Sequence, residues 1–176
     1  MEEQAKTASP LSNESRNIYV IERLTGALLT LMEEKPISGI SISELCAAAG
    51  VGRTSFYRNF ETREDILRAR VEKLLGGLAA ELKKDPALPL DRLVYRVFSH
   101  LEGNRAFYGL VYRRGYAYLL KDALLDLCGF APEREAVSAY ASAYAAFFLY
   151  GWIETWFRRG MRETAAELAS YLADAR

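Results

Sequence analysis

The stretch Ser41–Phe60, SISELCAAAGVGRTSFYRNF, decides the fold expected of the first third of this chain. An alanine-rich segment that favours helix stops at Gly50, and a second helical segment begins at Gly52 or Arg53. A tight turn between steeply crossing helices needs a residue that takes a left-handed backbone conformation, which glycine does without strain. Small side chains before the turn, Cys46 among them, let the two helices approach closely. The pattern predicts a helix-turn-helix.

Capping signals frame this motif. Ser41 and Glu44 form a capping box, in which the Ser41 hydroxyl accepts from the Glu44 N–H and the Glu44 carboxylate bonds back. Thr62-Arg-Glu-Asp65 has the same signature at the start of the next helix, with acidic residues in its first turn. The residues spaced to close a small core between the two helices of the motif are Leu45, Val51 and Phe56.

Polar and aromatic side chains cover the expected exposed face of the second helix: Arg53, Thr54, Ser55, Tyr57, Arg58 and Asn59. A helix fits the major groove of B-DNA, where arginine donates two bonds to guanine and serine or threonine contacts bases or phosphates. The Tyr57 hydroxyl suits a phosphate oxygen. Arg63 begins the next helix, where a cation and free backbone N–H groups together suit the DNA backbone.

Charge sets a condition on this interpretation. The chain has 23 Lys and Arg against 23 Asp and Glu, so DNA binding must depend on a local patch. Glu61, Glu64 and Asp65 lie close in sequence to the arginines of the motif and leave only a modest positive excess. We therefore expect high affinity to need two copies of the domain.

Composition excludes several other classes. With 176 residues, 51% of them hydrophobic, the chain can bury a core as one domain or as a small domain joined to a larger one. His100, Cys46 and Cys128 are the only histidine and cysteines, which leaves no disulfide framework and no spacing for a metal site. No nucleophile–base constellation is present, so we expect neither an enzyme nor a cofactor. The acidic, polar N-terminus lacks a signal peptide, and we expect a cytoplasmic protein.

The periodicity is helical nearly throughout, which predicts an all-α protein. We expect a flexible arm over 1–12, a three-helix DNA-binding domain over 13–62, a connecting helix over 63–84 and a helical dimerisation and regulatory domain over 90–176. Two prolines in Asp85–Pro89 mark the boundary. The expected helices are 13–34, 42–49, 53–60, 63–84, 90–102, 104–114, 116–128, 132–159 and 164–174.

The run Ala136–Ile153 raises the question of a membrane span, because its 18 uncharged residues are near the lower limit for one. It contains serine, tyrosine and many alanines, and Glu135 and Glu154 bracket it without an asymmetry of flanking basic residues. We interpret it as a helix of a soluble domain, buried on both sides, and expect no membrane contact.

The segment from Ile42 to Leu67 resembles the DNA-binding domain of the TetR family of one-component transcriptional regulators. The matching elements are Leu45, Ala49-Gly50-Val51, Phe56-Tyr57-Arg58, Phe60 and Thr62-Arg63-Glu64-Asp65. The resemblance implies that Ser41, Tyr57 and Arg63 contact phosphates and that Arg53, Thr54 and Ser55 contact bases. Asn59 replaces a frequent histidine and Arg63 a usual lysine, and both keep a donor for phosphate.

For the rest of the chain the resemblance implies a dimer interface and, usually, an inducer pocket between helices. The aromatic candidates for a pocket are Tyr95, Phe98, Phe107, Tyr112, Tyr144, Phe148 and Trp152. On helix 132–159 we expect one face to line the interior of the domain, the face that carries Val137, Tyr140, Tyr144, Phe148 and Trp152. The small residues that would admit a helix of a second copy are Ala139, Ala143 and Ala146.

The segments Tyr150–Met161 and Thr164–Glu167 resemble the C-terminal domain of regulators similar to the dihydroxyacetone-kinase regulator group. That resemblance leaves two kinds of signal open, a small apolar or aromatic inducer and a partner protein. The sequence thus predicts a homodimeric regulator, expected to be a repressor, that binds a pseudo-palindromic double-stranded operator. The alternative is a helical adaptor that acts through a partner protein without a small-molecule inducer.

Overall fold

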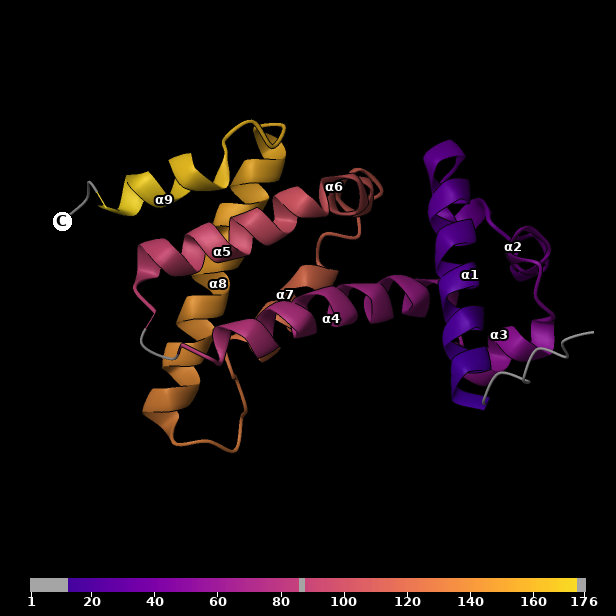
Figure 1. The fold of residues 1–176 in the computed structure, drawn as a ribbon, viewed down its shortest axis with the longest axis horizontal. Coiled ribbons are helices and arrows are strands. Elements are labelled where there is room, and N and C mark those ends of the chain that lie inside the picture. Colours follow the sequence, from indigo (N-terminus) through magenta and orange to yellow (C-terminus); the bar gives the residue numbers. More distant parts are fainter. Residues whose placement is uncertain (1–12, 86–87, 174–176) are drawn as a thin grey trace, which may run out of the picture. The chain divides into compact units, whose positions relative to one another are not determined.

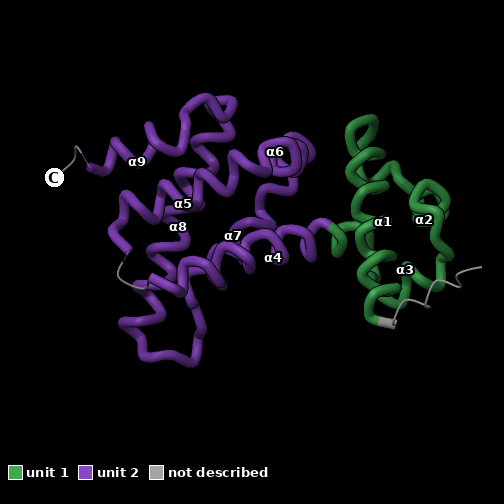
Figure 2. Tube along the Cα trace, in the orientation of Figure 1, with its two compact units in different colours: residues 1–66 green, residues 67–176 purple. Residues whose placement is uncertain are grey.

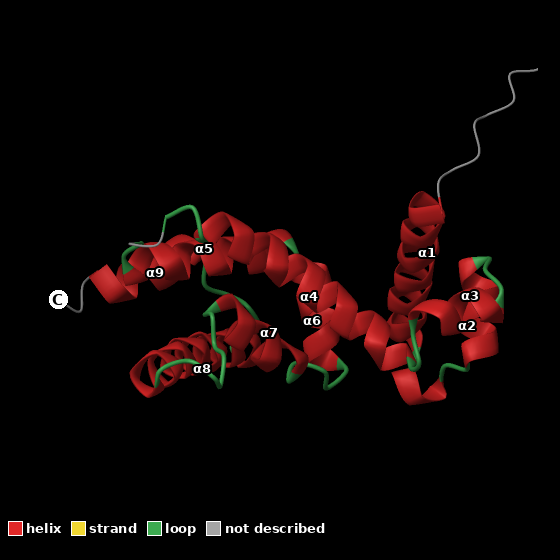
Figure 3. Ribbon diagram, turned by 90° about the horizontal axis from the view of Figure 1, so that it is seen from below, coloured by secondary structure: helices red, strands yellow, loops and turns green. Residues whose placement is uncertain are grey.

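The computed structural model describes residues 13–85 and 88–173, and within these ranges the chain forms helices and no strand (Figures 1 and 3). The all-α prediction is confirmed. The chain divides into two compact units, residues 1–66 and 67–176 (Figure 2). The expected arm 1–12 lies outside the described residues.

Unit 1 is built from α1 (Asn13–Glu34), α2 (Ile42–Ala49), α3 (Arg53–Asn59) and the first residues of α4 (Arg63–Leu82). α1 packs against both α2 and α3, which also contact each other (Figure 1). A short 3-10 turn, η1 (Ile37–Gly39), lies between α1 and α2 and was not predicted. The large, fully buried side chains of this unit are Leu24, Leu28, Met32, Ile37, Ile40, Leu45, Phe56 and Ile66.

Unit 2 contains the rest of α4 together with α5 (Leu90–Gly103), α6 (Arg105–Arg113), α7 (Leu119–Leu127), α8 (Ala136–Arg158) and α9 (Ala165–Ala173). α9 packs along α5, and α8 packs along α7. The predicted helix at 132 begins instead at Ala136. The reason is a turn in which Arg134 donates from Nη1 to the carbonyl oxygen of Gly129 at 2.7 Å.

Aromatic side chains join α5, α6 and α8 inside unit 2. Phe98 of α5 meets Trp156 of α8 edge-on, with 5.6 Å between ring centroids. Tyr112 of α6 stacks on Phe157 of α8 at 4.8 Å. Trp156 Nε1 also donates to the carbonyl oxygen of Glu163 at 2.8 Å, which satisfies its buried polar group. These contacts fix the end of α8 within the unit.

A capping box formed by Thr164 and Glu167 begins α9. The Thr164 N–H donates to Glu167 Oε2 at 2.7 Å, and the Glu167 N–H donates to Thr164 Oγ1 at 3.2 Å. A third partner comes from α5, because Glu102 Oε1 accepts from the Ala165 N–H at 2.9 Å. The helix N-terminus is therefore satisfied both locally and by the helix on which it packs.

The exposure of α8 differs from the prediction that it is buried on both sides. The side chains of Val137, Tyr140 and Tyr144 are 74%, 79% and 78% exposed, so they do not line the interior of the domain. The buried face of α8 instead carries Ala146, Leu149 and Ile153. Among the described residues, α8 is also the one helix whose length and composition suffice to cross a membrane.

Candidate nucleic-acid interface

The N-terminus of α2 is held by a cap and an ion pair. The Ser41 Oγ accepts from the Glu44 N–H at 3.1 Å, as the capping box predicts. The Glu44 carboxylate meets the Lys35 ammonium at 2.6 Å, a partner that the sequence did not indicate. Its hydrogen bond from Lys35 lowers the pKa of Glu44 below the ordinary value. The beginning of α2 is thereby joined to the segment that follows α1.

The turn after α2 has the predicted left-handed glycine. Gly50 has φ 68° and ψ 34°, its N–H donates to the Ala47 carbonyl at 3.1 Å, and the Val51 N–H donates to the Cys46 carbonyl at 3.0 Å. These two bonds make a Schellman motif, which ends the helix and reverses the chain. Arg23 of α1 supplies a further bond from Nε to the Ala49 carbonyl oxygen at 2.8 Å.

Cys46 is a packing residue in this arrangement. Its side chain is 3% exposed, and burial raises the pKa of the thiol, which keeps it neutral. Leu45 and Phe56 are fully buried, as expected for the core of the motif, whereas Val51 is only half-buried.

Burial of Phe56 orients α3. Because Phe56 is 0% exposed, the opposite side of this short helix faces outward. That side carries Thr54 and Arg58, flanked by Arg53 and Tyr57, and all four side chains are exposed. The Tyr57 side chain is 59% exposed, and its ring meets the buried Phe56 ring edge-on at 5.2 Å between centroids. This contact holds the Tyr57 ring in place while its hydroxyl remains accessible. α3 thus presents two guanidinium groups and two hydroxyls on one surface.

Ser55 and Asn59 occupy the flank of α3 nearest α1 and are half-buried. The Asn59 side-chain nitrogen donates to the Ser55 carbonyl oxygen at 2.9 Å, which leaves the amide oxygen for other contacts. On the other flank, Arg53 Nη1 lies 3.5 Å from Ser43 Oγ of α2. The structure therefore brings Ser43 to the surface that contains Arg53.

The start of α4 is a complete capping box. The Thr62 N–H donates to Asp65 Oδ2 at 2.7 Å, and the Asp65 N–H donates to Thr62 Oγ1 at 3.2 Å. The Asp65 carboxylate thus accepts from backbone N–H groups, and the Glu61 N–H donates to the same oxygen at 3.1 Å. Arg63 is half-buried, and its Nη1 donates to the carbonyl oxygen of Ile40. Its guanidinium thus links α4 to the residue before Ser41 and retains other donors.

The aromatic residues considered for a ligand pocket do not gather at one place. Phe98 is fully buried and Tyr112 is stacked on Phe157, whereas Tyr95 and Tyr144 are 43% and 78% exposed. Phe107 is half-buried and meets Tyr108 at 5.1 Å. Phe148 and Trp152 pair on α8 at 5.3 Å between centroids. Trp152 also lines a cavity of about 270 Å³ between the end of α8 and α9.

The alanines considered for a dimer interface lie closer to the core of their own chain than expected. Ala146 is 2% exposed and so is inaccessible to a second copy, which corrects the prediction for this residue. Ala139 and Ala143 are half-buried. The accessible apolar row of α8 is a different one: Val137, Tyr140, Tyr144 and Phe147.

Comparison with known proteins agrees with this geometry. Residues 24–69 match the family model described as bacterial regulatory proteins, tetR family. No curated protein matches the chain significantly. The match covers the helix-turn-helix. Arg23, which donates to the Ala49 carbonyl oxygen, lies one residue before the match begins.

Three solved structures show the extent of the shared fold. Lin0861 from Listeria innocua has 15% sequence identity and a TM-score of 0.73, over 95% of this chain and 94% of that chain. The dihydroxyacetone kinase operon activator DhaS has 16% identity and a TM-score of 0.58, over 90% and 94%. NalD, the secondary repressor of the MexAB-OprM multidrug efflux pump in Pseudomonas aeruginosa, has 16% identity and a TM-score of 0.57, over 91% and 94%.

Proposed function

We propose that this chain, a TetR-family regulator with a DNA-binding N-terminal domain, is a cytoplasmic homodimeric repressor that binds a pseudo-palindromic operator. The observation that carries the proposal is the outward side of α3, where Thr54 and Arg58 are exposed opposite the buried Phe56 and Arg53 and Tyr57 are exposed on the adjoining flank. Inserted into the major groove, α3 would place Arg53 and Thr54 against base edges and the Tyr57 hydroxyl against a phosphate.

The exposed apolar row on α8 supports the dimer. Val137, Tyr140, Tyr144 and Phe147 follow one another at steps of three and four residues, the spacing of a seam between two helices. Side chains that are 52% to 79% exposed along one stripe are costly to leave in water. Burial of this row against its copy would make a symmetric interface and present two α3 helices to one operator.

The proposed contact surface explains why two copies are needed. Arg53 and Arg58 are the basic groups on the outward side of α3, and Arg63 already donates to Ile40. A few phosphate contacts per copy give weak binding at physiological salt. Doubling the number of contacts raises the affinity and makes its dependence on salt steeper. Two α3 helices would occupy successive major grooves about 34–36 Å apart.

A signal at unit 2 would change that separation, and signal and operator would then weaken each other's binding by the same factor. A small apolar inducer is one candidate. The second is a partner protein. It is favoured because the candidates Phe98 and Tyr112 pack on Trp156 and Phe157, apart from Trp152, which with Trp156 lines the cavity of about 270 Å³.

The decisive experiment is selection of duplexes from a random library by the full chain, followed by binding measurements across a range of salt. We expect enriched sites with two inverted half-sites about 10 base pairs apart and affinity that falls with salt. Absence of enrichment, or affinity independent of salt, would reject the proposal.

Two variants assign the contacts. Arg53→Ala should relax the preference at one position of each half-site, by about 10-fold or more if the arginine bonds to guanine. Tyr57→Phe should weaken all duplexes about equally, because only a phosphate contact is lost. Tyr57→Phe is a sharper probe of the backbone than Arg63→Ala, since Arg63 also holds Ile40 within the fold.

A further inference from the structure

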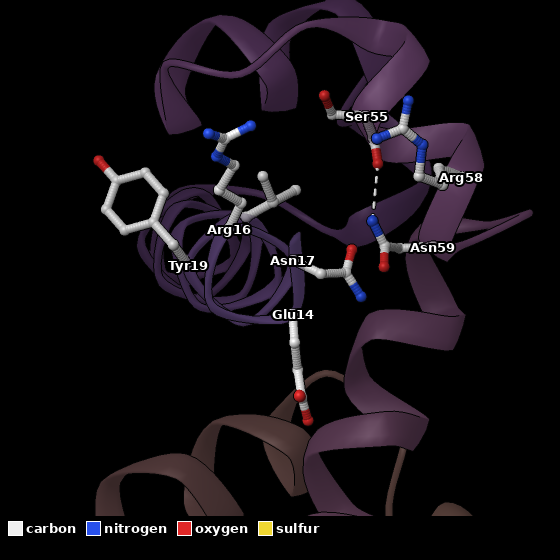
Figure 4. Close-up of a pocket in the computed structure, with 8 residues that line it drawn as sticks. Glu14, Arg16, Asn17, Tyr19, Ser55, Arg58 and Asn59 are labelled. Atoms are coloured by element: carbon white, nitrogen blue, oxygen red, sulfur yellow. Dashed lines mark hydrogen bonds between the residues drawn. The ribbon is translucent and has the colours of Figure 1, made fainter. Parts of the chain in front are cut away.

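A polar groove of about 770 Å³ lies between the N-terminal half of α1 and the C-terminal half of α3 (Figure 4). α1 contributes Glu14, Arg16, Asn17 and Tyr19 to its wall. α3 contributes Ser55, Arg58 and Asn59. Figure 4 shows Asn17 directed from α1 toward Asn59 of α3, with Arg16 on the same side of α1 as Ser55. Both helices belong to unit 1.

The groove suits an anion. Two guanidinium groups, those of Arg16 and Arg58, line the groove against the one carboxylate of Glu14, and Figure 4 shows Glu14 directed away from both arginines. The amides of Asn17 and Asn59 and the hydroxyls of Ser55 and Tyr19 add neutral donors and acceptors. Arg16 is exposed and Tyr19 is 55% exposed, so a charged backbone in water can reach both.

Arg58 joins this groove to the surface proposed for DNA. It lies on the side of α3 opposite Phe56 and also lines the groove. The groove therefore opens beside the outward side of α3, on its α1 flank. A helix in the major groove has a DNA sugar-phosphate backbone along each flank. The flank of α3 that carries Arg53 would meet one backbone, and the flank nearest α1 would meet the other.

We propose that this groove is a second DNA-contacting site, in which Arg16 and Asn17 of α1 bind phosphodiester oxygens of the strand that flanks α3. Arg58 then contacts the same backbone segment from α3, and Tyr19 offers a further hydroxyl. By these phosphate contacts α1 fixes the orientation of α3 in the major groove of the DNA without contributing sequence preference. The inference rests on the proposed function and extends it to a helix outside the helix-turn-helix.

Two variants with opposite effects test it in the full chain. Arg16→Gln should weaken binding to a selected duplex and to an unrelated duplex alike, by about 5- to 10-fold at low salt. It should also lower the slope of log affinity against log salt by about one for each copy in the dimer. Glu14→Gln should strengthen binding by about 2- to 5-fold, because it removes a negative charge from the rim of the groove.

Arg92→Gln is the matched control, since Arg92 is an exposed arginine of α5 in unit 2. It makes the same charge change and should leave affinity and salt slope near those of the wild type. Thermal unfolding of each variant checks that the fold is kept. If Arg16→Gln behaves like Arg92→Gln while Arg53→Ala still relaxes sequence preference, the groove is not a DNA site and the proposed function stands. If the wild type binds no duplex, the proposed function itself fails.

Free phosphate has the same chemistry as the DNA backbone, so a second arm separates the two sources. Wild type and Arg16→Gln are heated with 10 mM inorganic phosphate and with chloride at the same ionic strength. We expect phosphate to give neither protein added stability over chloride. A rise in the melting temperature with phosphate that Arg16→Gln abolishes would assign the groove to a free anion and overturn the proposal.

Discussion

The Nε of Arg23 on α1 lies 2.8 Å from the carbonyl oxygen of Ala49, the last residue of α2. The bond places a cation at the C-terminus of α2, where the helix dipole favours positive charge and a carbonyl lacks an intrahelical partner. It also ties α1 to the turn that sets the direction of α3. A residue outside the helix-turn-helix therefore helps to hold the angle between its two helices.

Loss of this bond should lower stability. We expect Arg23→Gln to reduce the free energy of unfolding by about 1 kcal/mol, toward the low end for a charged hydrogen bond because Arg23 is solvent-exposed. Urea unfolding followed by circular dichroism measures the change. Arg16→Gln removes an arginine from the same helix without a bond to a carbonyl and should unfold at nearly the wild-type midpoint. Equal midpoints for all three proteins would show that the Arg23 bond contributes nothing.

The left-handed turn makes a separate prediction. Gly50→Ala should destabilise the protein by about 1–2 kcal/mol, because Gly50 has φ 68° and an added Cβ would also lie 3.3 Å from Arg23 Nη2. Gly26→Ala is the control. Gly26 lies within α1, where a Cβ meets nothing within 4 Å, so alanine should stabilise by up to about 1 kcal/mol. Thermal unfolding distinguishes the two, and the same sign for both variants would contradict the turn's role.

The dimer seam predicts a change of assembly. Tyr144→Asp puts a charge into the middle of the exposed row of α8 and should convert a dimer into monomers in sedimentation experiments. Because Tyr144 is 78% exposed in the single chain, the variant should keep its helical circular dichroism. Tyr118→Asp, at a tyrosine 49% exposed outside α8, should leave the assembly unchanged. A dimeric Tyr144→Asp would place the interface elsewhere.

Acid should destabilise the protein through its single histidine. His100 Nε2 lies 3.0 Å from the Tyr108 hydroxyl, and burial lowers the pKa of His100 although Glu81 opposes this. A folded-state pKa below the ordinary value of about 6.5 means that the unfolded chain binds the proton more tightly. The stability from neutral His100 is present above pH 6.5 and is lost as the pH falls through the folded-state pKa.

Melting temperatures between pH 7.5 and pH 5 measure this loss. We expect His100→Gln to flatten the profile in this window, where no other histidine titrates. Tyr108→Phe removes the hydroxyl but keeps the ring, and should keep most of the pH dependence because burial remains. Parallel profiles for wild type and His100→Gln would show that His100 is not the group responsible.

Local signals in the sequence were sufficient for the α-helices of the N-terminal unit, although not for η1. Gly50, the Ser41 cap and the Thr62–Asp65 box act over a few residues, and each has the predicted geometry. The burial of Phe56 followed from its spacing. The exposure of Thr54 and Arg58 followed from the same helical periodicity, which places them on the face opposite Phe56. Whether these side chains meet DNA remains a prediction.

Contacts between residues distant in the sequence could not be predicted from the local sequence pattern. Nothing local distinguishes Arg23, which bonds 26 positions away, from other exposed arginines of the chain. Arg63 was expected to meet phosphate, and its bond to Ile40 depends on how α4 begins beside η1. α8 was misjudged because an all-round apolar helix does not reveal which face its own domain covers.

The sequence by itself determined where the helices of the N-terminal unit start and stop and which residues of α3 can face water, since caps, glycine turns and helical periodicity act within a few residues. Only the tertiary structure decided that Arg16 lies across a groove from Arg58, that Arg23 caps α2 and that Tyr140 and Tyr144 remain exposed. These relationships depend on which helices pack together, and packing is set by the whole core rather than by any one segment.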